Sequence, residues 1–278
     1  MVRILSDTSA LFTIEEGRQM GLEVIPLSVT IDDHTYLDLQ EIDGAGLIEL
    51  IEQGHIPTSS QPSVGETMRA YESAPGEELL YLTMADGLSG TYQSACGARA
   101  QLEPNQHIHV LNTRTLCGPH RYLVQRALQA AKQGLGAREI LAKLQHSVDH
   151  SLSFLIPNDF DFLRRGGRLS SFSAAIGGML KIVPVVRQNE EGNRLVSFAM
   201  KRNFKGAVDA IGKAMQRFVH SEEDPIYISH ACAPDLAQRA YDMMRALFAR
   251  NPIEILPLSP VFVTQGGPRC VAIQTLYA

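Results

Sequence analysis

The first half of the chain alternates short apolar runs with longer stretches that have helical periodicity. Apolar runs typical of buried strands stand at residues 2–5, 22–31, 78–84 and 107–112. Helical patterns cover residues 10–20, 42–53, part of the stretch between 84 and 107, 116–133 and 136–149. Alternation of strands and helices predicts a mainly parallel sheet with helices on both faces.

The pattern changes after about residue 155. The runs 183–187 and 195–199 flank a polar turn that contains Gly192, and this arrangement predicts an antiparallel hairpin. Further expected elements are helices over 204–219 and 234–249 and strands over 226–230, 253–259, 261–265 and 271–277. We therefore expect an α/β domain over 1–155 and a smaller α+β domain over 156–278, with a ligand cleft between them.

Composition excludes several classes of function. The 278 residues carry a net charge of -5 and contain no long run of Lys or Arg. We therefore do not expect nucleic acid as a partner. No segment approaches the roughly 18 consecutive apolar residues of a membrane span, and the start is too short and polar for a signal peptide. We expect a soluble, cytoplasmic protein without stable membrane insertion. The four cysteines are scattered without a C-x-x-C pair, so we expect them to be reduced and to serve packing.

A loop bounded by Pro57 and Pro62 carries several hydroxyl groups. Ser63 and Glu66 have the S-x-x-E spacing of a capping box, which explains Ser63 without a ligand. Thr58, Ser59 and Ser60 form a dense set of hydrogen-bond donors beside a helix start, although an ordinary polar loop has the same composition.

A second candidate site follows the strand at 78–84. Ser89 and Gly90 open a stretch of good helix formers, and a helix start at the carboxyl end of a parallel strand presents free N–H groups to an anion. A small anion such as a carboxylate could use the Ser89 hydroxyl and the Gly90 amide, because glycine lets a ligand approach the backbone. The alternative is that Ser89 only caps the helix.

Other polar segments have structural explanations, and signatures of catalysis are missing. The triplet Asp7-Thr8-Ser9 ends the first strand at the same sheet edge and is typical of a helix cap. The three arginines and two glycines within 163–170 suit a left-handed helix end. No nucleotide-binding or zinc-hydrolase motif occurs, and His107 and His109 have no third ligand nearby, so we expect neither a metal nor a cofactor.

Taken together, these segments resemble the DegV family over nearly the whole chain and in the same order. The resemblance rests on residues 6–9, 24–27, 57–63, 88–95, 163–170 with 180–184, and 266–268. It implies a Rossmann-like first domain with a mainly parallel sheet, a smaller second domain with antiparallel strands, and a long-chain fatty acid such as hexadecanoate held between them.

The resemblance also implies roles for single residues. Ser59 and Ser89 match family positions that hydrogen-bond the carboxylate, and Thr58 and Gly90 stand beside them. Arg202 matches an arginine that faces a separate fatty acid kinase, the partner that makes the acyl phosphate for phospholipid metabolism, although a solvated arginine at a helix start is equally common. By this resemblance the chain is a lipid-binding protein and not itself an enzyme.

Two departures from the family pattern affect the expected carboxylate site. Ser59 replaces a threonine and keeps the hydroxyl, whereas Gln265 stands where the family commonly has a histidine, and Arg269 replaces a glycine. Two other functions stay open at this point. One is a phosphotransfer enzyme of related fold, which would need a phosphate-accepting histidine or an acidic metal cluster. The other is an interaction protein whose lipid is only structural.

Overall fold

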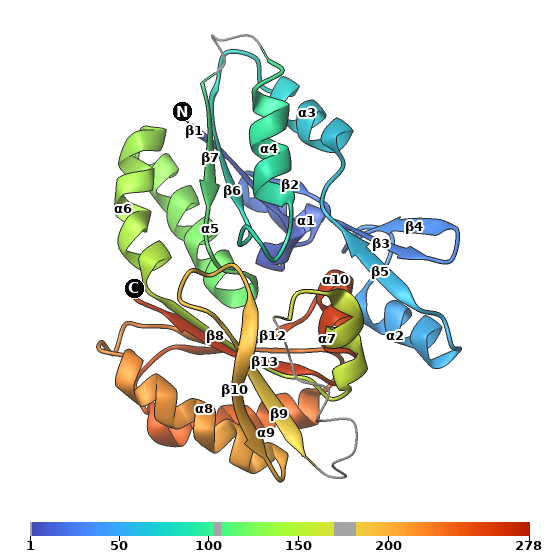
Figure 1. The fold of residues 1–278 in the computed structure, drawn as a ribbon. Helices are drawn as coiled ribbons and strands as arrows, with labels where there is room; N and C mark the ends of the chain where they lie inside the picture. Colours follow the sequence, from blue (N-terminus) through green and yellow to red (C-terminus); the bar gives the residue numbers. More distant parts are fainter. Residues whose placement is uncertain (1, 103–106, 170–181) are drawn as a thin grey trace.

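The structure, a computed structural model, describes residues 2–102, 107–169 and 182–278. Its first half is built on a parallel four-stranded sheet, as the sequence predicts (Figure 1). In spatial order the strands are β2 (Leu22–Ile25), β1 (Val2–Asp7), β6 (Glu78–Thr83) and β7 (Ile108–Asn112). The helices of this half are α1 (Ile14–Met20), α3 (Val64–Glu72), α4 (Thr91–Arg99), α5 (Cys117–Lys132) and α6 (Ala137–Asp149).

Alternating residues of β1 face opposite helical layers. Ile4 packs in the same core as Val124 of α5, whereas its neighbour Leu5 packs with Tyr71 of α3 and Ala95 of α4. Successive side chains of a strand point to opposite faces, so an apolar run such as 2–5 is buried on both sides only if helices cover both. Figure 1 shows α5 and α6 on one side of this sheet and α3 and α4 on the other.

The second half contains a six-stranded mixed sheet. In spatial order its strands are β10 (Leu195–Lys201), β9 (Val183–Gln188), β8 (Ser151–Ile156), β13 (Val271–Leu276), β11 (Ile226–His230) and β12 (Ile253–Pro257). All neighbours are antiparallel except β11 and β12, and the predicted hairpin is the pair β9–β10. Helices α8 (Phe204–Phe218) and α9 (Pro234–Leu247) pack on one face.

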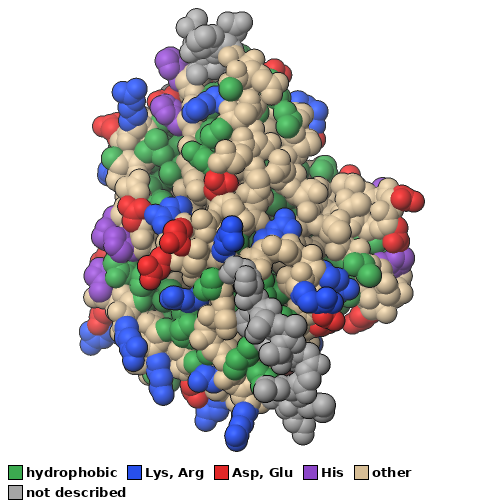
Figure 2. Space-filling view, in the orientation of Figure 1, with side chains coloured by type: hydrophobic (Ala, Val, Ile, Leu, Met, Phe, Trp, Pro, Cys, Tyr) green, Lys and Arg blue, Asp and Glu red, His purple; other side chains and the backbone are tan. Residues whose placement is uncertain are grey.

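The opposite face of the six-stranded sheet packs against the first half. Tyr227 of β11 belongs to the same core cluster as Val124 of α5. A Cβ added to Gly118 would overlap the Tyr227 ring, so glycine at this position lets α5 lie directly on the second sheet. On the face shown in Figure 2, Lys and Arg side chains gather over the part built by this second sheet and its helices.

A three-stranded antiparallel arm projects beside the two sheets (Figure 1). It contains β4 (His34–Leu37), β3 (Ser28–Ile31) and β5 (Pro57–Ser60), and near it lie α10 (Pro260–Gly266), α2 (Gly44–Glu52) and α7 (Phe160–Gly166). The short helix η1 (Thr8–Ala10) follows β1 and packs against α5.

Three predicted elements differ in this region. The run 22–31 is two strands in different sheets, because Pro26 separates β2 from β3. Residues 57–60, expected in a loop, form β5 on the edge of the arm. Residues 261–265, expected as a strand, lie in α10, which Pro260 opens at the first helical position. None of the helices in the described ranges combines the length and hydropathy needed to cross a bilayer. The predicted α/β fold class is confirmed.

Candidate functional site

A cavity of about 80 Å³ lies where the two halves of the chain meet. Its lining is mostly apolar, with a few polar side chains. The first half contributes Leu27, Ser59, Ser60, Gln61, Met84, Leu88, Ser89 and Leu116, and the second half contributes Arg168, Leu195, Val261, Phe262 and Gln265. Mostly apolar cavities with a few converging polar groups at such a junction are typical of small-molecule sites.

Two serines and one glutamine predicted from the sequence line this cavity together. The Gln265 amide Nε2 donates to the Ser59 hydroxyl at 3.0 Å and to the Thr264 hydroxyl at 3.2 Å. The Gln265 carbonyl oxygen is buried and accepts no hydrogen bond from the described residues. A buried acceptor without a donor is uncommon and costs free energy. The structure thus brings Ser59 and Gln265 into contact although 206 positions separate them.

Ser89 has both a local partner and a place in the cavity lining. Its hydroxyl lies 2.8 Å from the Thr91 hydroxyl and accepts a 3.3 Å hydrogen bond from the Thr91 amide at the start of α4. The N-cap of α4 is Gly90 and no side chain in the described ranges caps this helix start, so the long contact from the Thr91 amide to Ser89 lies one residue ahead of the cap. A hydroxyl has a second lone pair and a donor hydrogen, so Ser89 can also bond an anion in the cavity.

Arg168 is a cavity residue that the sequence reasoning did not identify. Its Nε donates to the Leu88 carbonyl at 3.2 Å and its Nη1 to the Gly166 carbonyl at 2.6 Å. Within the described ranges no carboxylate pairs with it, whereas Arg164 pairs with Asp161 at 3.2 Å. Arg168 is half-buried. A half-buried guanidinium without a counter-charge is a ready partner for a carboxylate.

The local sequence explains how Arg168 leaves its helix. Gly167 ends α7 with φ of 70°, in the left-handed region that the two glycines predict, so the residue after it turns away from the helix axis. Arg165, in the last turn, stays on α7 and lies 4.7 Å over the Phe162 ring. The sequence signal for Arg168 is therefore its position just beyond a left-handed glycine.

A second cavity of about 110 Å³ adjoins the first. Both are lined by Ser59, Arg168 and Gln265, so the hydrogen bond between Gln265 and Ser59 stands where the two meet. Thr58 lines the second cavity and not the first. A Cβ on Gly166, which also lines the second cavity, would overlap the Gln265 side chain, so glycine at 166 gives Gln265 its position.

Gly90 and Arg202 lie outside the two cavity linings. Gly90 is the N-cap of α4, and a Cβ there would overlap the Gln61 amide, so Gly90 makes room for a cavity residue. Arg202 is exposed between β10 and α8. Three residues of the family resemblance, Ser170, Leu180 and Lys181, lie outside the described residues.

Other candidate groups have structural roles. Asp7 is buried and caps η1, because its carboxylate accepts hydrogen bonds from the Ser9 amide at 2.9 Å and the Met84 amide at 3.0 Å. Ser63 accepts from the Glu66 amide at 3.0 Å, as the capping spacing predicts. In the described part of the chain no three His, Cys, Asp or Glu side chains gather as metal ligands would.

Comparisons with known proteins cover the whole chain. A family model described as "Uncharacterised protein, DegV family" matches residues 1–278. A DegV domain-containing protein of Staphylococcus aureus is 26% identical over 276 residues, which is 98% of each chain. Another, of Clostridium acetobutylicum, is 28% identical over 281 residues, covering 98% of this chain and 96% of the relative.

Solved structures share the fold. A fatty acid binding DegV family protein from Streptococcus agalactiae has a TM-score of 0.89 at 28% identity, covering 100% of this chain and 99% of its own. A structure described as fatty acid binding of a DegV family protein from Thermus thermophilus has a TM-score of 0.88 at 24% identity, with the same coverage.

Proposed function

Because the chain belongs to the DegV family, we propose that it binds a long-chain fatty acid in the cavity between its two halves. The observation that carries the proposal is the half-buried guanidinium of Arg168, which has no described carboxylate partner and lies with Ser59 and Ser89 in a mostly apolar cavity. The fatty acid binding relative from Streptococcus agalactiae, 28% identical over the full chain, supports the same ligand class.

The head group is held by donors from both halves. The Ser59 and Ser89 hydroxyls donate to the carboxylate oxygens, and Arg168 supplies the opposite charge. Burying a carboxylate is costly unless it is paired and hydrogen-bonded, and these three groups provide both. Ser59 keeps its hydrogen bond from Gln265 while its own hydroxyl hydrogen turns to the ligand.

The tail supplies most of the affinity. Burial of each methylene contributes roughly 0.8 kcal/mol, so about 14 methylenes contribute on the order of 11 kcal/mol before ordering costs. The cavity of about 80 Å³ is smaller than the ~150 Å³ that accommodates one benzene ring. Its apolar lining must therefore move apart, and Met84, with an unbranched flexible side chain, suits such a movement.

The bound acid is presented to a separate kinase in the cytoplasm. Arg202 is exposed and next to Lys201, with Lys205 following on α8, and a basic surface of this kind suits an acidic patch on a partner. The four cysteines carry free thiols, which suits a reducing compartment.

The first experiment is extraction of protein purified from bacteria with organic solvent, followed by mass spectrometry of the extract. We expect a fatty acid in near-stoichiometric amount. Protein that yields no lipid and also fails to take up labelled palmitate or oleate contradicts the proposal.

The second experiment tests the kinase as partner. The variant Arg202→Ala should leave lipid uptake intact and reduce acyl phosphate formation with a cognate kinase. A loss of lipid uptake would instead assign Arg202 to the lipid site.

A further inference from the structure

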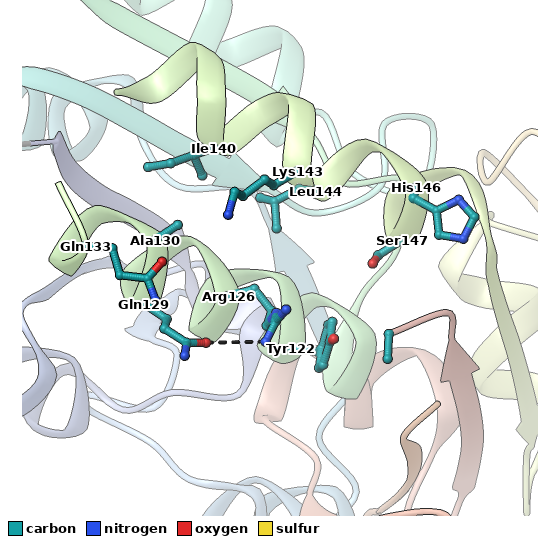
Figure 3. A pocket seen from close by; sticks show the side chains of 11 residues that line it. Tyr122, Arg126, Gln129, Ala130, Gln133, Ile140, Lys143, Leu144, His146 and Ser147 are labelled. Atoms are coloured by element: carbon teal, nitrogen blue, oxygen red, sulfur yellow. Dashed lines mark hydrogen bonds between the residues drawn. The ribbon is translucent and has the colours of Figure 1, made fainter. Parts of the chain in front are cut away.

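A separate cavity of about 250 Å³ lies between α5 and α6 and shares no lining residue with the candidate lipid site. Figure 3 shows side chains of both helices bordering the space between them. The lining consists of Tyr122, Arg126, Gln129, Ala130 and Gln133 from α5 and its end, Ile140, Lys143, Leu144, His146 and Ser147 from α6, and Ala278.

The cavity exists because the two helices face each other partly through polar side chains. Tyr122, Arg126, Gln129 and Gln133 are spaced by four, three and four positions, so they share one face of α5. Packed helices ordinarily bury apolar stripes against each other. Here a small residue, Ala130, lies beneath the polar stripe and leaves space.

The polar groups at this cavity are mainly hydrogen-bond donors. Arg126 donates through Nη1 to the Gln129 carbonyl oxygen at 3.3 Å, which leaves most of its five N–H groups available. Neither Arg126 nor Lys143 has an ion pair within the described ranges, and no Asp or Glu side chain lines the cavity. Arg126 and Lys143 therefore stand at the cavity without an ion pair in the described ranges, and the lining also includes the last residue, Ala278, whose terminal carboxylate is an anion.

The nearby acidic side chains in the described ranges form no ion pair with these cations. Burial raises the pKa of the Tyr122 phenol; Arg126 opposes this shift, and Asp224 and Glu223 add to it by a smaller amount. Asp224 is buried and already accepts hydrogen bonds from the amides of His220, Ser221 and Ala278. With its pKa raised, the Tyr122 hydroxyl keeps its proton and remains a donor at the cavity wall.

We propose that this cavity between α5 and α6 binds a small phosphate-bearing anion. The forked guanidinium of Arg126 and the ammonium of Lys143 match the several acceptor oxygens of a phosphate, and Tyr122 and Ser147 add hydroxyl donors. The volume is below the ~300–1,000 Å³ of sites for drug-sized ligands, so the ligand is inorganic phosphate, pyrophosphate or a phosphate monoester of a few carbons. The proposal does not depend on the lipid site.

The test is titration calorimetry of the full chain with inorganic phosphate, pyrophosphate and glycerol phosphate, each at an ionic strength held constant with KCl. We expect one-to-one saturable binding of at least one of them, and the tightest of the three identifies the source of the phosphate group. Arg126→Gln and Lys143→Gln should each weaken that binding about tenfold or more, because each removes a charge-assisted contact. Both side chains are exposed, and circular dichroism checks that the variants fold.

Matched controls lie on the same two helices. Lys132→Gln on α5 and Arg138→Gln on α6 remove equal charge from exposed positions outside the cavity, so binding should change by less than about twofold. Absence of saturable binding for all three anions at millimolar concentration overturns the proposal. Equal weakening of binding by the control variants overturns it as well, because the effect then comes from general surface charge. Binding that survives both Arg126→Gln and Lys143→Gln also overturns the proposal.

Discussion

At the scale of single residues, the proposed carboxylate site depends on Arg168. It is half-buried at the junction of the two cavities, and within the described part of the chain it has no carboxylate partner. Arg168→Gln should weaken fatty acid binding by about 1.5–3 kcal/mol, the contribution of a hydrogen bond to a charged group. Fluorescence displacement of a labelled fatty acid measures the change.

The matched control for Arg168 is Arg164→Gln. Arg164 is exposed on α7 and pairs with Asp161, an interaction of the kind that contributes little to stability. Its loss should leave ligand affinity unchanged. If both variants weaken binding equally, the positive field of α7 acts as a whole and Arg168 has no direct contact with the head group.

Gln265 leads to a prediction about how ligand affinity depends on pH. A glutamine does not titrate, and among the described residues no histidine lines either cavity. Affinity for a soluble short-chain acid should therefore stay nearly constant between about pH 8 and pH 6, above the range where the acid itself titrates. Gln265→His should make affinity rise as pH falls through about 6.5, because an imidazolium then pairs with the carboxylate.

The same titration on both proteins tests this assignment. Gln265 donates a hydrogen bond to Ser59, so an imidazole at position 265 would stand beside the proposed head-group site. A flat profile for Gln265→His would show that position 265 does not contact the carboxylate. A step already present in the unmodified protein would assign the pH response to another group.

At the scale of elements, α10 is capped from a distant segment. The amide of Val261, in the first turn of α10, donates to the Asp38 carboxylate at 3.1 Å across 223 positions of sequence. Asp38 is fully buried, and burial raises the pKa of its carboxyl to about 6. The helix that carries Val261, Phe262 and Gln265 into the cavity therefore depends on a buried acid.

This cap predicts an unusual pH dependence of stability. The unfolded chain releases the Asp38 proton near pH 3.8, whereas the folded protein keeps it up to about pH 6. Between these values the folded state binds more protons, so the free energy of unfolding falls as pH rises, by a total on the order of 3 kcal/mol. Asp38→Asn keeps an acceptor for the Val261 amide, and it should raise the free energy of unfolding by about 1–3 kcal/mol above pH 6 and progressively less towards pH 4.

Urea unfolding of both proteins at several pH values measures this difference. Buried His120 contributes a slope of the opposite sign, since burial lowers its pKa and the unfolded chain takes up the proton first below about pH 6.5. His120 is present in both proteins, so its contribution to the free energy of unfolding cancels in the difference between them. A gain or loss that is the same at every pH would mean that the charge of Asp38 has no part in the effect.

Elements with clear periodicity could be predicted from the sequence, and elements whose partners are distant could not. The parallel strands and the hairpin β9–β10 follow from local patterns. The run 261–265 is apolar enough for a strand, but Pro260 and the distant Asp38 cap make it a helix. Ser59 and Ser89 stand out as hydroxyls in polar loops, whereas Arg168 gains its place only when α7 lies beside Leu88, 80 positions away.

At the scale of the whole molecule, the two halves share one core. The largest buried cluster joins Leu27 and Val124 of the first half to Tyr227 and Val261 of the second. The division at residue 155 stays a prediction. Strand β8 (Ser151–Ile156) pairs with β13, so residues 151–154, on the first-domain side of that division, lie in the six-stranded sheet. A broad apolar interface of this kind favours cooperative unfolding of the two halves.

If a fatty acid binds between the halves, it should stabilise both of them. A ligand that binds only the folded state adds about 2.7 kcal/mol at a free concentration of 100 times its Kd. We expect the most protected amides of β1 and β6 in the four-stranded sheet, and of β11 and β13 in the six-stranded sheet, to slow in hydrogen exchange by a similar factor when delipidated protein is reloaded with palmitate. These strands do not line the cavity, so their response reports global opening and not local contact.

Hydrogen exchange followed by mass spectrometry at one pH and temperature measures both sheets in one sample, with Arg168→Gln as the weak-binding reference. Slowing confined to one sheet would show that the halves open separately and that the ligand belongs to a single half. The loops around Met84 and Leu116 should slow as well, because these side chains line the cavity and contact with the acyl chain would restrain them.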